Sequence, residues 1–364
     1  MNYNASQKKA IYANDNKIVC LAAPASGKTR TLTARVERLI NEGVDPTKIV
    51  AITFTRMAAE EMRNRLGERA ETMFIGTVHS YANKVCALNG ITNYTPISQG
   101  DFDRIITNAI KIPKDQYPEV EHLLIDESQD LTPLEFGFIE KIPYKNIFYV
   151  GDDRQNIYQF RGSTDQYIRH MANDPDFTVY YLLENYRNAP NILDFANDLI
   201  SDIDPLSPNS KPVKQKDGIL EKVSFDIALQ DLEEAENWSS WFILTRTNNE
   251  LEVACDILTQ KEIPYITFKI GELENNDVLE SIIKDNVVKV LTIHSSKGLE
   301  NSNVIVIGAR LYSEEERKIA YVGATRAKNA LYWCPGIRKR KKKGQAVKRI
   351  QELVEEDPHM ISFE

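Results

Sequence analysis

The sequence predicts an α/β protein with two domains, each a mainly parallel sheet flanked by helices. Short runs rich in β-branched and aromatic residues alternate with stretches of helical periodicity. This alternation is typical of parallel sheets covered on both faces. With 364 residues, the chain is long enough for two such domains and their cores. A single sheet of about ten strands is the alternative, and we expect two sheets instead.

The apolar runs define the expected strands, and helical patterns lie between them. Strands are expected at 17–23, 49–55, 122–127, 146–152, 179–184, 240–247, 264–269, 288–294, 303–309 and 330–334. Helices are expected at 29–41, 58–66, 190–200, 249–260 and 314–327. We place the first domain at 1–183, with a small insertion at about 81–120, the second domain at 184–335 and a basic tail at 336–364.

The composition is that of a soluble globular protein, with 27% charged and 42% hydrophobic residues. No apolar run approaches the roughly 18 residues that cross a membrane, and the first residues lack the core of a signal peptide. Four widely spaced cysteines argue against a zinc site or a disulfide framework and suit a cytoplasmic protein. The net charge of −8 hides a basic run at 338–349, which is either part of a nucleic-acid track or a solvated tail.

A phosphate-binding loop is predicted where the strand at 17–23 runs into Gly27-Lys28-Thr29. Such a loop requires a strand before it and a helix after it, and both are expected here. Backbone N–H groups and Lys28 would hold phosphates, while the hydroxyl of Thr29 would bind Mg²⁺. Ala23 and Ala25 stand where glycine is common and narrow the backbone choices. The alternative for the loop alone is a chance match after an apolar strand.

An acidic pair, Asp126-Glu127, follows the apolar run HLLI at the expected carboxyl end of a strand. Asp126 suits Mg²⁺, and Glu127 suits the orientation and deprotonation of an attacking water molecule. An ordinary acidic strand-to-helix turn is the alternative. Because the pair follows a G-K-T loop in a parallel α/β order, the two motifs together predict hydrolysis of a nucleoside triphosphate.

Nine ordered segments resemble the motifs of superfamily 1 helicases of the UvrD, Rep and PcrA type. They are YNASQ (3–7), GKTR (27–30), AITFTRMAAEEMRNRL (51–66), GTVHSYA (76–82), DESQD (126–130), VGDDRQNIYQFRGS (150–163), LLENYRN (182–188), LTIHSSKGLE (291–300) and EEERKIAYVGATRAK (314–328). The resemblance covers nearly the whole chain and implies two RecA-like P-loop NTPase domains, with ATP and Mg²⁺ bound between them.

The resemblance also implies the roles of individual residues at the nucleotide. Gln7 would recognise the adenine edge, Tyr186 would stack on adenine, and Glu300 would meet the ribose or the catalytic edge. Gln155 would contact the γ-phosphate, and Arg187 and Arg326 would be arginine fingers supplied by the second domain. The nucleotide cradle would consist of Ala23, Pro24, Ala25, Ser26, Gly27, Lys28, Thr29 and Arg30.

A path for single-stranded DNA is implied by the same motifs. Aromatic rings stack on any base and therefore suit a motor that ignores sequence. For Tyr158 and Phe160 the alternative is packing in the core, which the polar frame QNIYQFRGS disfavours. His79 and His294 are read as polar contacts rather than metal ligands, since neither has a partner at ligand spacing. The residues assigned to the path are Phe54, Thr77, His79, Tyr158, Phe160, Arg161, His294 and Lys297.

The predicted function is an ATP-dependent translocase on single-stranded DNA and a DNA helicase, acting on tailed duplexes in repair or replication, with 3′→5′ polarity by resemblance. The spacing between the motifs is short, so most of the two inserted subdomains of the large family members is missing. This shortness motivates an alternative, an ATP-gated DNA-binding or signalling subunit that serves a nuclease, loader, repair or phage-defence partner without strand separation. A small-molecule P-loop kinase fits poorly, because the second domain would have no task.

Overall fold

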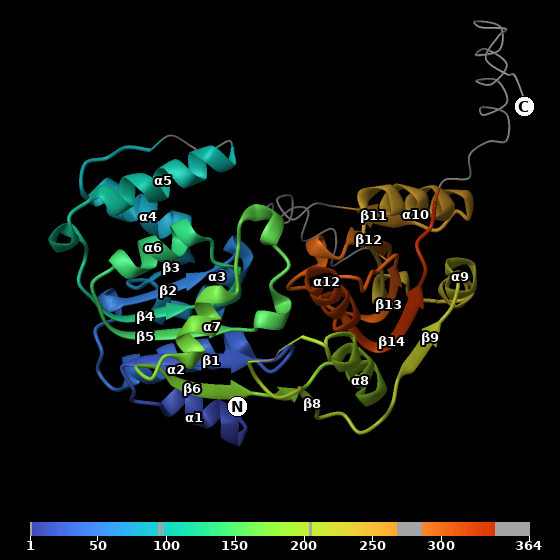
Figure 1. The fold of residues 1–364 in the computed structure, drawn as a ribbon, viewed down its shortest axis with the longest axis horizontal. Helices are drawn as coiled ribbons and strands as arrows, with labels where there is room; N and C mark the ends of the chain where they lie inside the picture. Colours follow the sequence, from blue (N-terminus) through green and yellow to red (C-terminus); the bar gives the residue numbers. More distant parts are fainter. Residues whose placement is uncertain (1, 94–95, 97, 204–205, 268–285, 339–364) are drawn as a thin grey trace, which may run out of the picture.

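The computed structural model describes residues 2–93, 96, 98–203, 206–267 and 286–338, and it contains two separate six-stranded sheets (Figure 1). Every strand pair in both sheets is parallel. The predicted fold class is therefore confirmed, and the single-sheet alternative is wrong. Most of the predicted basic tail and the end of the strand predicted at 264–269 lie outside the described residues.

The first sheet places the ends of three central strands side by side. Its spatial order is β3-β2-β4-β5-β1-β6. Since β5 lies between β4 and β1, the loops after these three parallel strands leave the same edge next to one another. The strands are β1 (Lys17–Ala22), β2 (Ile49–Thr53), β3 (Phe74–Thr77), β4 (Val120–Ile125), β5 (Tyr144–Gly151) and β6 (Thr178–Leu182).

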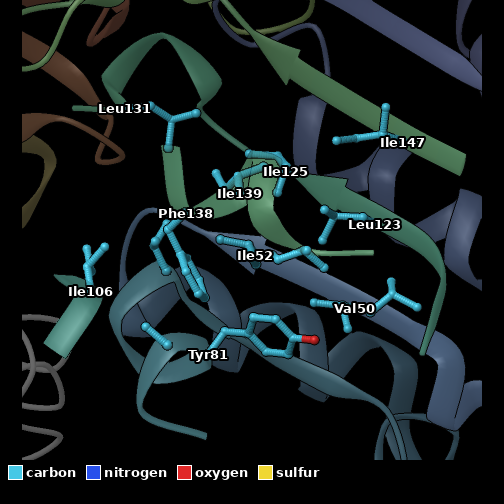
Figure 2. Packing of buried hydrophobic residues seen from close by; sticks show 14 of the residues in the cluster. Val50, Ile52, Tyr81, Ile106, Leu123, Ile125, Leu131, Phe138, Ile139 and Ile147 are labelled. Carbon is cyan, nitrogen blue, oxygen red and sulfur yellow. The ribbon is translucent and has the colours of Figure 1, made fainter. Parts of the chain in front are cut away.

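Helices cover both faces of this sheet because the side chains of each buried strand alternate between two cores. On β1, Val19 and Leu21 face one core, whereas Ile18 and Cys20 face the other. The first core receives α4 (Val78–Leu88), α5 (Gln99–Lys111), α6 (Pro133–Lys141) and α7 (Gln166–Asn173), and part of it is shown in Figure 2. The second core receives α1 (Ala5–Tyr12), α2 (Lys28–Asn41) and α3 (Arg56–Leu66).

The second sheet has the order β11-β12-β10-β13-β14-β9 and is covered in the same way. Its strands are β9 (Ile219–Lys222), β10 (Trp241–Thr245), β11 (Tyr265–Thr267), β12 (Val288–Thr292), β13 (Asn301–Ile307) and β14 (Ala327–Cys334). One face packs on α8 (Pro190–Leu199) and α12 (Glu314–Ala324), and the other on α9 (Phe225–Glu233) and α10 (Asn248–Gln260). Between the two sheets, β7 (Glu184–Asn185) pairs with β8 (Lys211–Pro212).

The sequence did not reveal β3 and β9, and the end of the last predicted helix is wrong. Both strands lie at sheet edges and are only four residues long, so neither produces a long apolar run. The helix predicted at 314–327 ends at Ala324, because β14 already begins at Ala327. Among the described residues, no helix combines the length and the apolar character that a membrane crossing requires. The predicted domain boundary at 183/184 stays a prediction.

The tyrosines of the first core allow a matched test of stability. The hydroxyl of Tyr81 is buried and has no hydrogen-bond partner among the described residues. The hydroxyl of Tyr117 donates to the carbonyl of Ala109 at 2.6 Å. Because an unpaired buried hydroxyl is costly, we expect Tyr81→Phe to keep or raise the free energy of unfolding. Tyr117→Phe should lower it by about 1 kcal/mol. Denaturant titration measures both, and an equal loss in the two variants would contradict this account.

Candidate nucleotide site at the domain interface

The loops after β1, β5 and β4 bring the predicted hydrolysis residues together. The hydroxyl of Thr29, after β1, lies 3.2 Å from Oδ2 of Asp126, after β4. Nζ of Lys28 lies 3.9 Å from Oε1 of Glu127 and 3.5 Å from the carbonyl of Ala22. The sheet order alone explains this meeting of residues that are about a hundred positions apart, because neighbouring parallel strands end at one edge.

The phosphate loop has an unusual backbone at the two positions where it turns into α2. Gly27 has φ +84°, and a Cβ atom built on it would lie 2.9 Å from Nε2 of Gln7. Ala25 has φ +56°, in the left-handed region that disfavours side chains other than glycine. Ser26 closes the loop, because its hydroxyl donates to the carbonyl of Ala23 at 2.7 Å. The backbone strain that we expect from alanine in this loop is therefore found at Ala25.

The start of α2 fits a bound phosphate. This 14-residue helix begins at Lys28 directly after Gly27, and within the described chain no side chain caps it. The first N–H groups of a helix lack partners in the helix itself and carry partial positive charge. Lys28 adds a full charge at the same place, and the oxygen atoms of Thr29 and Asp126 are the hard ligands that Mg²⁺ prefers. The residues present therefore fit a nucleoside triphosphate with its magnesium ion.

The two carboxylates of the acidic pair lie in different electrostatic environments. Burial and the neighbouring charge of Glu127 raise the pKa of Asp126 to about 7. Burial also raises the pKa of Glu127, but the charges of Lys28 and Lys297 outweigh this effect, and its net pKa is lowered. Glu127 also has φ +50°, which is rare for a residue with a side chain and is a form of strain seen at functional sites. Glu127 is thus the member of the pair that stays ionised and can accept a proton.

Gln129 joins the acidic pair to the loop after β5. Its Nε2 donates to Oε2 of Glu127 at 2.6 Å, and its Oε1 accepts from the backbone N–H of Asp152 at 3.0 Å. Oδ2 of Asp152 in turn accepts from Nε2 of Gln155 at 2.7 Å. Gly151 has room for this arrangement only because it lacks a Cβ atom, which would lie 2.5 Å from Oε1 of Gln129. A continuous chain of hydrogen bonds therefore connects Glu127 to Gln155.

The linker between the sheets, here Asn185 and Tyr186, donates hydrogen bonds to backbone carbonyls of the phosphate loop. Nδ2 of Asn185 donates to the carbonyl of Pro24 at 3.1 Å, and the N–H of Tyr186 donates to the carbonyl of Ala25 at 3.2 Å. The Tyr186 ring is partly exposed, and its hydroxyl accepts from Nδ2 of Asn4 at 2.7 Å. Any shift of this linker therefore reaches the cradle directly.

The two predicted arginine fingers lie together on the second domain. Arg187 forms an ion pair with Glu300 and donates to the carbonyl of Thr325 at 3.1 Å. Arg326 is buried and donates to the carbonyls of Val322 and Leu299 at 2.9 and 3.2 Å.

Arg326 keeps its positive charge although its side chain is buried. Burial and the charge of Arg187 lower the pKa of Arg326 to about 9, so it remains charged at neutral pH. Arg326 is also close enough to Glu127 to lower the pKa of that carboxyl group. Of the two predicted arginine fingers, Arg326 is thus the one that lies near the acidic pair of the first domain.

A lysine of the second domain crosses to the first. Nζ of Lys297 forms an ion pair with Asp130 and donates to the carbonyl of Gln155 at 2.7 Å. The two side chains of the ion pair are 8% and 0% exposed. Lys297 also lies 5.1 Å from the ring centre of Tyr158, a favourable position for a cation against an aromatic face. Lys297 thus joins the two domains near Glu127, whose pKa its charge helps to lower.

Comparisons with known proteins agree with this geometry. Residues 3–96 and 97–176 match the profile of the UvrD/REP helicase N-terminal domain, and residues 268–334 match that of the UvrD-like helicase C-terminal domain. The chain belongs to the UvrD/REP helicase family.

Among curated relatives of this family, the ATP-dependent DNA helicase PcrA of Staphylococcus epidermidis is 25% identical, with 72% of this chain and 50% of that protein aligned. PcrA of Staphylococcus aureus is 24% identical over the same shares. The chain thus spans about half the length of the curated relatives it matches.

Among the residues that the helicase motifs assign to DNA, one group surrounds Lys297. The rings of Phe54 and Tyr158 stack with centres 5.2 Å apart, and Tyr158 is buried. Phe160 is 68% exposed, and its ring lies nearly perpendicular to the His294 ring, with the ring centres 5.3 Å apart. Phe160 therefore presents an open face for a base, whereas Tyr158 in this arrangement does not, and Lys297 is paired with a carboxylate rather than free for phosphate. The DNA roles of all five remain predictions.

The other assigned residues lie on the same side of the first domain or at its nucleotide cradle. The hydroxyl of Thr77 caps α4 by accepting from the N–H of Ser80 at 3.2 Å. Nδ1 of His79 lies 3.8 Å from Glu135, and Arg161 is exposed beside Tyr158. Gln7 is buried, with Nε2 on the carbonyl of Ser26 at 2.9 Å. The guanidinium of Arg30 stacks on the Tyr3 ring at 4.9 Å.

Sequence reasoning missed the residues that connect these motifs to one another. Gln129, Asp130 and Asn185 each lie inside a recognised motif, yet none was given a role. Their bonds cross between loops or between domains, so spacing along the chain does not reveal them. The signal that could have found them is their type, since an amide or carboxylate among buried apolar neighbours needs a partner.

His294 gives this helicase-family protein a testable dependence of stability on pH. Burial and the charge of Arg246 lower the pKa of His294 to about 4, against about 6.5 in an unfolded chain. Between these values the unfolded chain binds a proton that the folded protein does not. The contribution of His294 to the free energy of unfolding therefore falls as pH drops from about 7 to 4.

We expect His294→Gln to lose stability less steeply over this pH interval than the wild type. His170, which is exposed on α7, provides the control variant His170→Gln, and this variant should follow the wild-type curve. Denaturant titrations at a series of pH values measure the difference. Parallel curves for the wild type and His294→Gln would contradict the assignment.

Proposed function

We propose that this chain is an ATP-driven motor that moves along single-stranded DNA and separates tailed duplexes, with 3′→5′ polarity. The observation that carries the proposal is the segment from Asp152 to Phe160. It begins in the hydrogen-bond chain from Glu127 and ends at an exposed aromatic ring. A change at the hydrolysis residues therefore reaches a base-stacking surface through fewer than ten residues of chain.

The geometry of the interface supports the proposed hydrolysis chemistry. Bound ATP with Mg²⁺ would supply the reactive γ-phosphoryl group, held by the start of α2, Lys28, Thr29 and Asp126. Glu127, ionised and held by Gln129, orients a water molecule and accepts its proton. Arg187 and Arg326 supply positive charge from the opposite domain, where charge develops on the phosphoryl oxygens.

Contacts that cross between the domains support the proposed coupling to DNA. Lys297 binds both Asp130 and the carbonyl of Gln155, so it touches the acidic loop and the loop after β5 at once. Closure and opening of the interface therefore shift Phe54, Tyr158 and Phe160 relative to His294 of the second domain. Such relative movement of grips on two domains advances a strand past the protein. We place this activity in the cytoplasm, on DNA under repair or replication.

A second candidate function is an ATP-gated DNA-binding subunit that serves a protein partner without separating strands. The observation that favours it is the small size of the helical insertion after β3. Among the described residues between β3 and β4, the helices are α4, α5 and a short 3₁₀ turn at Lys114–Gln116. The curated helicases that the chain resembles are about twice its length. Both candidates share the nucleotide site and the DNA path, and they differ in strand separation alone.

The test of ATP turnover uses Lys28→Ala. We expect wild-type ATP turnover to rise when single-stranded DNA is added. Turnover by Lys28→Ala should be lower by roughly 100-fold or more, because the positive charge that faces the phosphoryl group is lost. The control is Lys145→Ala, an exposed lysine at the opposite end of β5 that should turn over ATP like the wild type. Wild-type ATP turnover that does not change when single-stranded DNA is added would contradict the proposed motor.

The two candidates are separated by duplexes with a 3′ tail, a 5′ tail or blunt ends. Release of the labelled strand from the 3′-tailed duplex, dependent on ATP and on Lys28, supports the helicase. Turnover stimulated by DNA without release of any strand supports the gated subunit instead.

A further inference from the structure

One edge of the second sheet carries side chains for which the nucleotide site has no use. The neighbouring strands β12, β10 and β13 are parallel and end at the same edge. The N–H of Ile293 donates to the carbonyl of Thr245 at 2.9 Å, and the N–H of Arg246 donates to that of Ile307 at 3.0 Å. His294, Arg246 and the loop at 308–313 therefore follow one another along this edge, about 5 Å from strand to strand.

The loop at 308–313 presents an exposed aromatic ring. Tyr312 is 75% exposed, more than any other large hydrophobic side chain in the described part of the chain, and Leu311 beside it is 39% exposed. Isolated exposed side chains are ordinary in proteins, but this ring is also held in place. Its hydroxyl donates to Oε1 of Glu316 at 3.3 Å, on the first turns of α12.

Glu316 is itself fixed by Arg246. The guanidinium donates twice to the carboxylate, at 2.7 Å from Nε and 2.7 Å from Nη2, which is the rigid two-bond geometry of an arginine–carboxylate pair. The N–H of Glu316 also donates to the hydroxyl of Ser313, which caps α12 immediately after Tyr312. The ring of Tyr312 is thus exposed and anchored at once, as a stacking surface needs to be, since little freedom is then lost on binding.

An exposed arginine lies in the same loop as the ring. Arg310 is exposed in the same loop, and it is close enough to Glu316 to help lower the pKa of that carboxyl group. Burial raises the pKa of Glu316, but the bonds and charge of Arg246 outweigh this effect. Arg310 is therefore an exposed cation that can meet a phosphate group beside the ring. The first turn of α12 nearby also carries Glu314, which pairs with Lys318, and Glu315.

The edge continues into the aromatic surface of the first domain. The His294 ring meets the Phe160 ring at 5.3 Å, and the carbonyl of His294 accepts from the hydroxyl of Tyr158 at 3.3 Å. On its other side, His294 is close enough to Arg246 and Glu316 for both to affect its pKa. Phe160, His294, Arg246 and Tyr312 therefore form one continuous line across the two domains, with an exposed aromatic ring at each end.

We infer that Tyr312 is a base-stacking residue for single-stranded nucleic acid, placed on the second domain as the counterpart of Phe160 on the first. This inference rests on the proposed function and extends it to the loop at 308–313. One base stacks on each ring, and the nucleotides between them pass along His294 and Arg246. Because the rings belong to different domains, closure of the interface changes their separation and moves the strand relative to one of them.

The test measures binding of a fluorescent oligodeoxythymidine to the full chain, with Tyr312→Ala and Tyr312→Phe as variants. We expect Tyr312→Ala to weaken binding by roughly 5- to 100-fold, the loss typical of one stacked base. Tyr312→Phe retains the ring and should bind within about twofold of the wild type. Tyr12→Ala removes another exposed tyrosine, at the end of α1 in the first domain, and should bind like the wild type.

A second measurement locates the contact directly. Oligonucleotides that carry 5-iodouracil at a single position form a crosslink to a stacked aromatic side chain on irradiation, and peptide mapping identifies the residue. We expect a crosslink at Tyr312 for one position of the oligonucleotide and a crosslink at Phe160 for another. Thermal unfolding checks that Tyr312→Ala folds. We expect it to fold, because the Tyr312 ring is exposed in the wild type.

The outcomes separate this inference from the function on which it rests. If Tyr312→Ala binds the oligonucleotide as tightly as the wild type and no crosslink forms at Tyr312, the inference is overturned and the proposed motor is unaffected. An equal loss in Tyr312→Phe and Tyr312→Ala also overturns it, because the hydroxyl contact to Glu316 would then be what matters. A wild-type chain that binds no single-stranded DNA overturns both the inference and the proposed motor.

Discussion

The buried ion pair between Lys297 and Asp130 is the contact on which the two-domain site depends. It joins a loop of the second sheet to the acidic loop of the first, and both side chains are nearly inaccessible to water. Two charges in such a place are stable only together, because removal of one partner leaves the other unpaired at a cost of about 3–5 kcal/mol. Burial raises the pKa of Asp130 to about 7, while Lys297 opposes this effect. The closed interface and the ionised state of this carboxyl group therefore support each other.

Further contacts extend the same principle along the interface. Lys318 of α12 is fully buried and lies 2.8 Å from Asp165 of the first domain. Arg169 binds both Asp165 and Asp153, and Arg154 reaches across to the carbonyl of Ser207. Lys318 and Arg154 thus make contacts between the domains, and Arg169 fixes the two carboxylates within the first domain. Polar groups at the interface suit the proposed motor, because they re-solvate when the domains part, whereas a large apolar interface resists opening.

The sequence was most informative where chemistry is local and least informative where it crosses the fold. The phosphate loop and the acidic pair are short segments, and the alternation of strands with helices placed them correctly at one sheet edge. Lys297 was expected to bind DNA, but its partner Asp130 lies 167 residues away, and no spacing rule connects the two. The sequence likewise did not reveal that Tyr158 is buried against Phe54, because these two residues are far apart along the chain. The strain expected from alanine in the loop became specific only when the backbone placed Ala25, and not Ala23, at positive φ.

A double-mutant cycle on Lys297 and Asp130 tests the central claim most directly. Lys297→Met and Asp130→Asn are made singly and together, and turnover of ATP in saturating single-stranded DNA is measured alongside the free energy of unfolding. If the pair acts as one unit across the interface, the double variant loses less than the sum of the single losses, with a coupling energy above about 1 kcal/mol in both measurements. Losses that simply add, with no coupling energy, would contradict the account.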